Sequence, residues 1–188
     1  MPRVKQRSDE EVLDAALRVM FAKGPADFTL ADVGEAAGIA PATLLQRFGD
    51  KRGLTVLAAA RENRRFAAML AGAPRAVGVD AVVDLLWSLT PGDDDEQNLA
   101  GQLLWAHQDL RDPEFNRLAR ERQAMLREAL MERLPTMPIG SEAAARLLEA
   151  QWQGALQQWS VERRGSLADY VTESIAAWFD LARPAPVA

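Results

Sequence analysis

The chain has 188 residues, no cysteine and a formal net charge of −5. The lack of cysteine excludes a disulfide scaffold and thiolate chemistry, and it fits a reducing compartment. The sequence contains no run of about 18 apolar residues and no basic leader before an apolar stretch, so neither a membrane span nor a signal peptide is indicated. We therefore expect a cytoplasmic protein with no membrane partner.

The charges are unevenly distributed along the chain. Residues 1–65 carry 11 Lys and Arg against 9 Asp and Glu, a balance of +2, and the remainder carries 11 against 18, a balance of −7. A basic end on an acidic body suits local contact with DNA phosphates, although a split this small also arises by chance. Arg3, Lys5 and Arg7 lie in an N-terminal arm that suits DNA contact and equally suits a solvated terminus.

The first expected helix begins after Ser8, which forms a capping box with Glu11. Residues 29–51 then predict two short helices joined by a glycine turn. Thr29 starts the first of them, Gly38 ends it, and Pro41 suits the first turn of the second. This is the helix-turn-helix pattern, in which the second helix enters the major groove of DNA.

A spaced set of residues extends the helix-turn-helix pattern on both sides: Ala15-Ala16, Phe21, Gly24, Thr29-Leu30, Ala36-Ala37-Gly38-Ile39, Thr43-Leu44, Phe48, Lys51 and Leu54. With this set, residues 12–57 resemble the DNA-binding region of TetR-type transcriptional regulators. A bare helix-turn-helix is common among all-α proteins, whereas the full spaced set is specific. The resemblance implies a ligand-responsive homodimeric repressor that binds a double-stranded DNA operator and is released by a small-molecule effector.

The predicted DNA contacts gather on the second short helix and just beyond it. In the family, the lysine matching Lys51 grips phosphate, and Asp50 is expected to cap the helix that follows. Thr43, Gln46 and Arg47 are the expected base readers, because they are the polar side chains on or beside the groove face. The complete predicted set is Thr29, Pro41, Ala42, Thr43, Leu45, Gln46, Arg47 and Lys51.

Three positions depart from the family pattern. Leu45 replaces a tyrosine whose hydroxyl commonly touches phosphate. Ala40 replaces a small polar helix cap, at a typical cost of about 1 kcal/mol. Gly53 replaces a better helix former, at a further cost of roughly 1 kcal/mol.

The rest of the chain also predicts helices, so the fold class is all-α. We expect a three-helix DNA-binding domain over residues 1–52 and a larger helical-bundle domain for effector binding and dimerisation over residues 53–188. The helices are expected at about 51–70, 79–89, 96–110, 113–134, 141–162 and 166–181.

Two regions of the larger domain carry functional predictions. The last two helices are expected to pack on a second copy, with an internal core as the alternative; their stripes include Trp152, Ala155, Leu156, Trp159, Val171, Ile175 and Trp178. An effector pocket is expected between the middle helices, although each of its residues also suits an ordinary core. That predicted pocket comprises Phe66, Met69, Leu70, Trp87, Gln102, Trp105, His107, Met125 and Trp152.

Two other classes of protein compete with this interpretation. An enzyme is disfavoured because the sequence shows no nucleophile paired with a base, no Glu-x-x-His di-metal pattern and no phosphate-binding glycine loop. We therefore expect no catalytic residue, metal or cofactor. A helical adaptor that kept the fold without DNA binding is the alternative, and Leu45 with the acidic body favours it.

Overall fold

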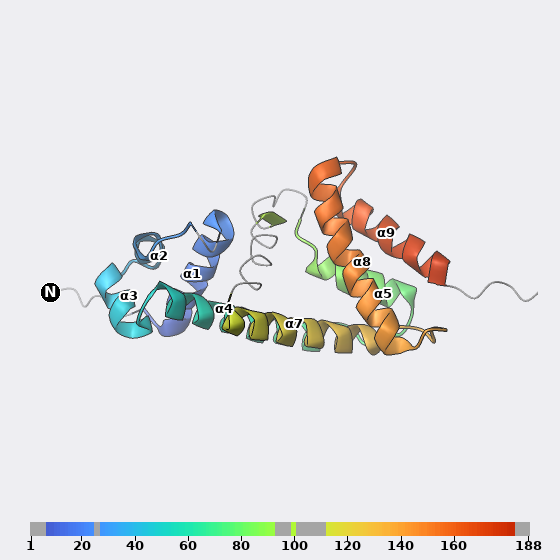
Figure 1. Ribbon diagram of the computed structural model, residues 1–188, viewed down its shortest axis with the longest axis horizontal. Helices are drawn as coiled ribbons and strands as arrows, with labels where there is room; N and C mark the ends of the chain where they lie inside the picture. The colour runs from blue at the N-terminus through green and yellow to red at the C-terminus, as the bar shows by residue number, and fades with distance from the viewer. Residues whose placement is uncertain (1–6, 25–26, 93–98, 101–111, 183–188) are drawn as a thin grey trace, which may run out of the picture. The chain divides into compact units, whose positions relative to one another are not determined.

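The computed structural model describes residues 7–24, 27–92, 99–100 and 112–182. Throughout this part of the chain the regular elements are α-helices, which confirms the all-α prediction (Figure 1). The helix expected at 96–110 lies almost wholly outside the described residues. None of the helices in the described ranges is long and apolar enough to cross a membrane.

The helix bounds agree closely with those expected from the sequence. The bounds are α1 (Asp9–Lys23), α2 (Leu30–Ala37), α3 (Pro41–Phe48), α4 (Lys51–Gly72), α5 (Val79–Leu89), α7 (Pro113–Met131), α8 (Ser141–Glu162) and α9 (Leu167–Ala182).

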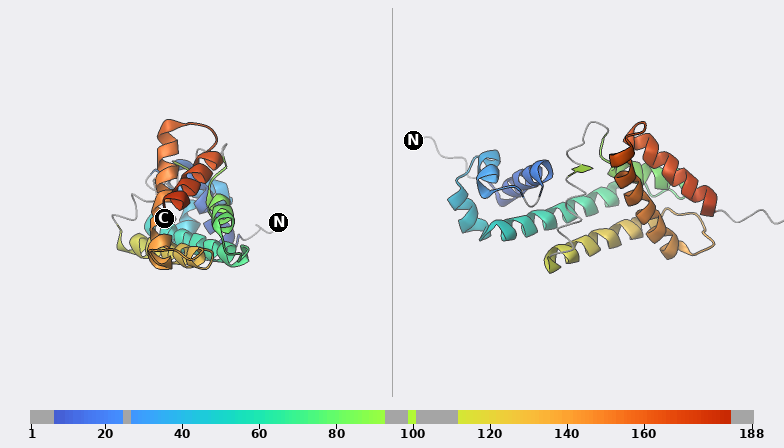
Figure 2. Two further views of the ribbon diagram at one scale, coloured as in Figure 1. Left: turned by 90° about the vertical axis from the view of Figure 1, so that its right-hand side faces the viewer. Right: turned by 45° about the horizontal axis from the view of Figure 1, so that its top comes forward.

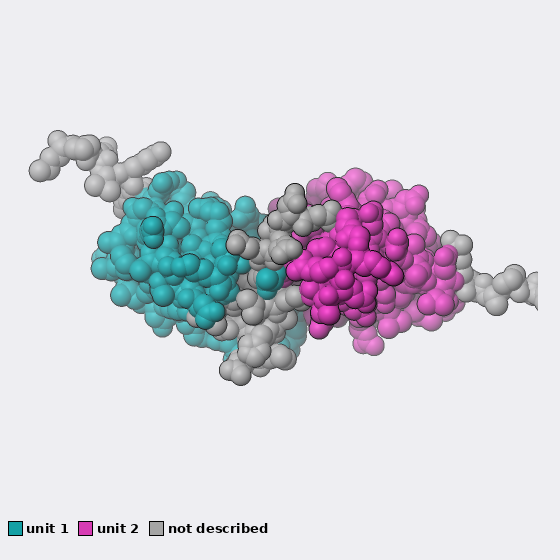
Figure 3. Space-filling model, turned by 90° about the horizontal axis from the view of Figure 1, so that it is seen from above, with its two compact units in different colours: residues 1–66, 100–121 teal, residues 67–99, 122–188 magenta. Residues whose placement is uncertain are grey.

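The chain divides into two compact units (Figure 3). Unit 1 comprises residues 1–66 and 100–121, and unit 2 comprises residues 67–99 and 122–188. Unit 1 therefore reaches beyond residue 52, where the sequence suggested a boundary. The reason is that the first part of α4 and the start of α7 pack with α1, α2 and α3.

The core of unit 1 draws on all of these helices. Phe115 and Leu118 of α7 join it from more than 50 positions further along the chain, so its closure needs a segment outside the helix-turn-helix. The other buried members are Val12, Leu13, Ala15, Ala16, Leu17, Met20, Phe28, Val33, Ala37, Leu44, Phe48, Leu54, Ala58 and Ala59.

In unit 2, α9 packs along α8 and also against α5, as the ribbon views show (Figure 2). The side chain of Gln151 in α8 donates to Ser174 Oγ in α9 at 2.7 Å. Arg133, which is 1% exposed, donates to the backbone carbonyls of Pro74, Ala129 and Ala73 at 2.9, 2.7 and 3.1 Å. This buried guanidinium therefore fastens the loop after α4 to the end of α7.

Candidate nucleic-acid interface

Reciprocal side-chain caps fix where α1 and α2 begin. The backbone N–H of Glu11 donates to Ser8 Oγ, and the backbone N–H of Ser8 donates to the Glu11 carboxylate. Thr29 and Asp32 repeat this arrangement, with the Thr29 N–H 2.7 Å from Asp32 Oδ2. Both predicted start signals are thus confirmed. Thr29 itself is exposed, and its hydroxyl is already engaged in the cap.

The turn between α2 and α3 requires glycine at two positions for different reasons. Gly38 ends α2 in the left-handed conformation, with φ 68° and ψ 37°. Gly34 lies one turn earlier, where an added Cβ would come within 2.7 Å of the Ile39 carbonyl oxygen. The close approach of these two backbones sets the angle at which α3 leaves α2.

Helix α3 buries one face and exposes the other, as the predicted recognition helix requires. Leu44 and Phe48 point into the core, whereas Gln46 is exposed and Thr43 is half-buried. Pro41 and Ala42 are exposed in its first turn. Ala40 precedes that turn without a side-chain cap, as expected, and Leu45 leaves 46% of its surface exposed.

The Arg47 side chain bonds to residues of α1 and the segment before it, and it does not extend away from the α3 surface. Its Nε donates to Asp9 Oδ1 at 2.7 Å, its Nη2 contacts the same oxygen, and its Nη1 donates to the Arg7 carbonyl at 2.9 Å. The guanidinium also lies 5.4 Å from the centre of the Phe48 ring. This geometry holds the start of α1 beside the end of α3, a role that its position on the helix surface did not suggest.

The junction of α3 and α4 places Lys51 at a helix start. Asp50 accepts the backbone N–H of Gly53 at 2.6 Å and so caps α4, as predicted. The Lys51 ammonium lies 4.3 Å from the centre of the Phe28 ring. A cation beside the free N–H groups of a helix start is a favourable arrangement for a phosphate.

Gly53 has a packing role that was not evident when it was identified as a departure from the family's sequence pattern. An added Cβ at this position would lie 2.4 Å from the Phe48 carbonyl oxygen. A better helix former therefore does not fit here. The interpretation of Gly53 as a simple loss of helix stability must be corrected, because this glycine lets α3 and α4 approach.

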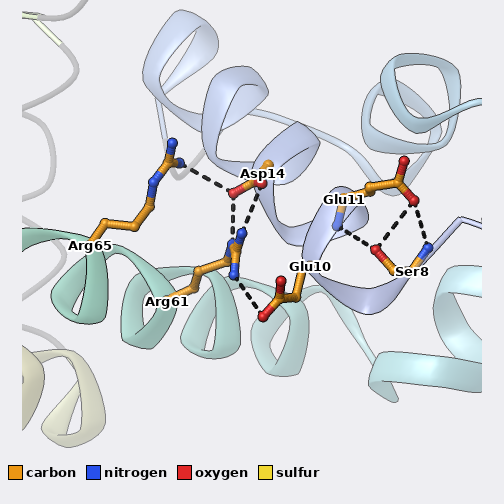
Figure 4. Close-up of polar contacts among 6 residues, drawn as sticks. All are labelled: Ser8, Glu10, Glu11, Asp14, Arg61 and Arg65. Carbon is orange, nitrogen blue, oxygen red and sulfur yellow. Dashed lines mark hydrogen bonds and ion pairs between the residues drawn. The ribbon is translucent and has the colours of Figure 1, made fainter. Parts of the chain in front are cut away.

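A network of ion pairs ties α1 to α4 (Figure 4). Arg61 binds both oxygens of Asp14, with Nε–Oδ1 at 2.7 Å and Nη2–Oδ2 at 2.9 Å. Arg65 adds a contact to Asp14 at 3.2 Å, and Arg61 also reaches Glu10 at 3.2 Å. Hydrogen bonding from Arg61 lowers the pKa of Asp14 and raises the pKa of Arg61.

A second pair joins the start of α4 to the start of α7. Arg52 donates to the two oxygens of Asp112 at 2.7 and 2.9 Å, which lowers the pKa of that carboxyl. Asp112 also accepts the backbone N–H of Glu114 at 2.9 Å and thereby caps α7. Neither this pair nor the Asp14–Arg61 pair was predicted, because a separation of 60 or 47 positions leaves no local signal.

The residues predicted to line an effector pocket have diverse environments. Trp87 is 59% exposed and Met69 is 42% exposed, whereas Leu70 is buried and Phe66 and Met125 are half-buried. Trp152 is 8% exposed, and its Nε1 donates to Thr90 Oγ1 at 3.1 Å. Gln102, Trp105 and His107 lie outside the described residues, so the predicted pocket remains a prediction.

Six of the seven residues predicted for a dimer interface are buried within the single chain. They therefore occupy the internal-core position that was the alternative interpretation, and Trp178 is half-buried. The opposite side of α8 is open, with Leu147 51% and Val161 82% exposed. The six buried residues are Trp152, Ala155, Leu156, Trp159, Val171 and Ile175.

Residues 12–60 match the model of a known family, described as bacterial regulatory proteins of the tetR family. None of the curated proteins compared with the chain matches its sequence significantly. A search of solved structures finds the same fold in transcriptional regulators of low sequence identity. A transcriptional regulator from Rhodococcus sp. Rha1 has 18% identity and a TM-score of 0.78, over 96% of this chain and 100% of its own.

Two further structures with this fold were solved with ligands. The multidrug binding protein EbrR, in complex with proflavin, has 22% identity and a TM-score of 0.65, over 90% of this chain and 98% of its own. The regulator FadR from Bacillus subtilis, in complex with stearoyl-CoA, has 14% identity and a TM-score of 0.67, over 90% of this chain and 96% of its own.

The described helices, with α2 and α3 joined by a glycine turn and α3 exposed on one face, define an all-α protein of the helix-turn-helix class. Residues 12–60 match the model of the TetR family, which agrees with the resemblance that the sequence carries. The chain as a whole has the same fold as the solved transcriptional regulator from Rhodococcus sp. Rha1.

Proposed function

We propose that the protein is a homodimeric, ligand-responsive repressor that binds operator DNA through α3. The observation that carries this proposal is the division of α3 into a buried face and an exposed face that begins at the helix N-terminus. Lys51 supplies a cation at the start of the next helix, with its ammonium over the Phe28 ring. An exposed short helix followed by an anion-binding helix start suits simultaneous contact with bases and phosphate.

The contacts within the proposed interface divide by chemistry. Gln46 is exposed and suits the hydrogen-bonding edge of adenine, and Thr43 suits a thymine methyl or a phosphate. Lys51 suits a phosphate. Arg47, which the sequence favoured as a base reader, instead acts through its bonds to Asp9 and the Arg7 carbonyl by holding α1 against α3. The remaining members of the proposed interface are Thr29, Pro41, Ala42 and Leu45.

A specificity measurement separates these roles. Substituting Gln46 by Ala should change the preference for bases at one operator position, by about 1–3 kcal/mol between the best and next base. Substituting Arg47 by Ala should lower the affinity for all sequences alike, because it loosens α1 without removing a base contact. Selection of bound sequences from random duplexes measures both effects. A position-specific change in Arg47→Ala with none in Gln46→Ala would contradict the assignment.

The proposed dimer uses the open sides of α8 and α9. On α8, Leu147, Ala150, Gly154 and Val161 recur at helical spacing, and a shallow hollow lies along this side. An added Cβ at Gly154 would meet nothing within 4 Å, so the helix backbone is accessible to close approach. The spacing of DNA half-sites also favours a dimer, because two recognition helices must reach half-sites about 34 Å apart. A protein that sediments as a monomer at micromolar concentration would contradict this arrangement.

The effector response is proposed to be a shift between two populations. A small molecule bound to the larger domain would favour one conformation and change the separation of the two recognition helices. Its effect is limited by its differential affinity for the two states. Proflavin in EbrR and stearoyl-CoA in FadR show that proteins with this fold accept chemically different ligands.

An adaptor without DNA binding is the second candidate function. Leu45 supports it, because an exposed leucine on the proposed recognition helix offers no hydrogen bond to phosphate. The two functions differ in salt response. A DNA-binding protein loses affinity steeply as salt rises, whereas an adaptor has no such affinity to lose.

A further inference from the structure

Glu149 in α8 is a buried carboxylate with half of its hydrogen-bonding capacity unused. The residue is 3% exposed, and its Oε2 accepts from Arg127 Nε at 2.6 Å. Its Oε1 is buried as well, and within the described residues no donor reaches this oxygen. An unpaired polar atom in the interior is costly, so it requires a specific reason.

The other buried polar side chains in the described part of the chain show how unusual this atom is. Thr55 donates to the Lys51 carbonyl at 2.6 Å, and Asn63 donates to the Leu118 carbonyl at 2.8 Å. Arg133 uses three nitrogens on three carbonyls. Each of these side chains is matched by a partner, whereas Glu149 keeps one oxygen without one.

The contact between Arg127 and Glu149 also differs from the structural ion pairs of this protein. In the Asp14–Arg61 and Asp112–Arg52 pairs, the guanidinium occupies both carboxylate oxygens. Arg127 instead contacts one oxygen of Glu149, while its Nη2 lies 3.5 Å from Gln123 Oε1. This arrangement fixes the carboxylate through Oε2 and leaves Oε1 available to another donor.

Glu149 contacts Arg127, and the buried residues next to Glu149 along α8 are apolar or aromatic. It lies on the buried side of α8 with Ala145, Leu148 and Trp152, which are 0%, 0% and 8% exposed. The bond from Trp152 to Thr90 fixes the indole ring. A fixed acceptor among apolar side chains is the usual composition of a site for a small organic molecule.

We propose that Glu149 Oε1 is the polar anchor of the effector site, and that the effector carries an N–H or O–H donor on an apolar frame. A cationic or neutral amine, amide or alcohol fits this anchor. A ligand that presents a carboxylate or phosphate at this point does not fit, because it would face the charge of Glu149. This inference rests on the proposed ligand-responsive function, since it names the chemistry of the same effector.

Proflavin is a suitable probe because it is a planar cation with amino donors, and anilinonaphthalene sulfonate is an anionic probe for comparison. Fluorescence titration of the full chain should give saturable proflavin binding. Glu149→Gln should weaken this binding about tenfold or more, since a hydrogen bond to a charged group is lost. Glu142→Gln removes an exposed carboxylate from the first turn of the same helix and should change it less than twofold. Binding of the anionic probe should not be weakened by either substitution.

Several outcomes would overturn the inference. These are the absence of saturable proflavin binding by the folded wild type, equal affinity in Glu149→Gln and the wild type, and an equal loss in Glu142→Gln. If thermal melting shows that Glu149→Gln does not fold, Glu149→Asp retains the charge but withdraws it by one methylene, and the same weakening is expected. DNA binding of the wild type, measured without the probe, tests the proposed function separately. Binding to DNA together with failure of the probe experiment would overturn the anchor alone.

Discussion

Two glycines of α4 show that the effect of a glycine-to-alanine substitution on stability depends on what surrounds the added Cβ. Replacing Gly53 with Ala should destabilise the protein by about 1–3 kcal/mol, because the new Cβ would lie 2.4 Å from the Phe48 carbonyl oxygen. Gly72 in the same helix has nothing within 4 Å of an added Cβ. Gly72→Ala is therefore the matched control and should leave stability unchanged or slightly higher. Urea denaturation measures both changes, and equal stability of the two variants would contradict the packing role of Gly53.

Asp32 makes the start of α2 sensitive to acid. Hydrogen bonding from Lys23, followed by the bonds from Thr29, lowers the pKa of Asp32 to about 2 in the folded protein, against 3.8 for the free side chain. A lowered pKa means that the ionised form is favoured by folding. The stabilisation is fully present above about pH 4 and is lost as the pH falls through about 2.

Asp32→Asn should therefore be less stable than the wild type near neutral pH, and the difference should shrink as the pH falls from 4 towards 2. Thermal melting at a series of pH values measures this convergence. A difference that stays constant down to pH 2.5 would show that the charge of Asp32 makes no contribution.

At the scale of the helices, the contact of α1 with α4 depends on the Asp14–Arg61 pair. Both side chains are partly shielded, at 28% and 16% exposure, and the pairing is bidentate. A double-mutant cycle with Asp14→Asn and Arg61→Met should give a coupling energy of about 1 kcal/mol. The same cycle with Arg65→Met should give a smaller value, because Arg65 is 58% exposed and makes one 3.2 Å contact. Equal coupling in the two cycles would contradict the bidentate assignment.

The helices themselves were predictable because their signals are local. Ser8 and Glu11, or Thr29 and Asp32, lie three positions apart, and each pair reveals a helix start within one turn. Contacts between helices were not predictable in this way. Arg47 bonds to Asp9, which lies 38 positions earlier in the chain. No local pattern indicates a contact over that separation, so the position of Arg47 on α3 alone predicted a base contact.

At the scale of the whole molecule, the all-α fold and the resemblance to the family could be predicted from the sequence, whereas the partner of each helix face could not. A stripe of Trp152, Leu156 and Trp159 is apolar whether it meets a neighbouring helix or a second subunit. Only the folded chain distinguishes these cases, since it buries that stripe internally and leaves Leu147, Gly154 and Val161 on the other side. The unpaired oxygen of Glu149, which we propose as the effector anchor, was equally unpredictable, because an unpaired atom has no signature in sequence.

We propose above all that this chain binds DNA through α3 and the start of α4. The most direct test is fluorescence anisotropy of the full chain on a labelled duplex from upstream of its own coding sequence. A scrambled duplex and two salt concentrations complete the experiment. We expect binding that is stronger on the upstream duplex and falls steeply with salt.

Lys51→Ala should weaken that binding and reduce the dependence of log affinity on log salt by about one unit, since it removes one phosphate contact. Arg75→Ala, which removes an exposed cation from unit 2, is the control and should leave the salt dependence unchanged. Absence of binding to either duplex at low salt would contradict the account and favour the adaptor.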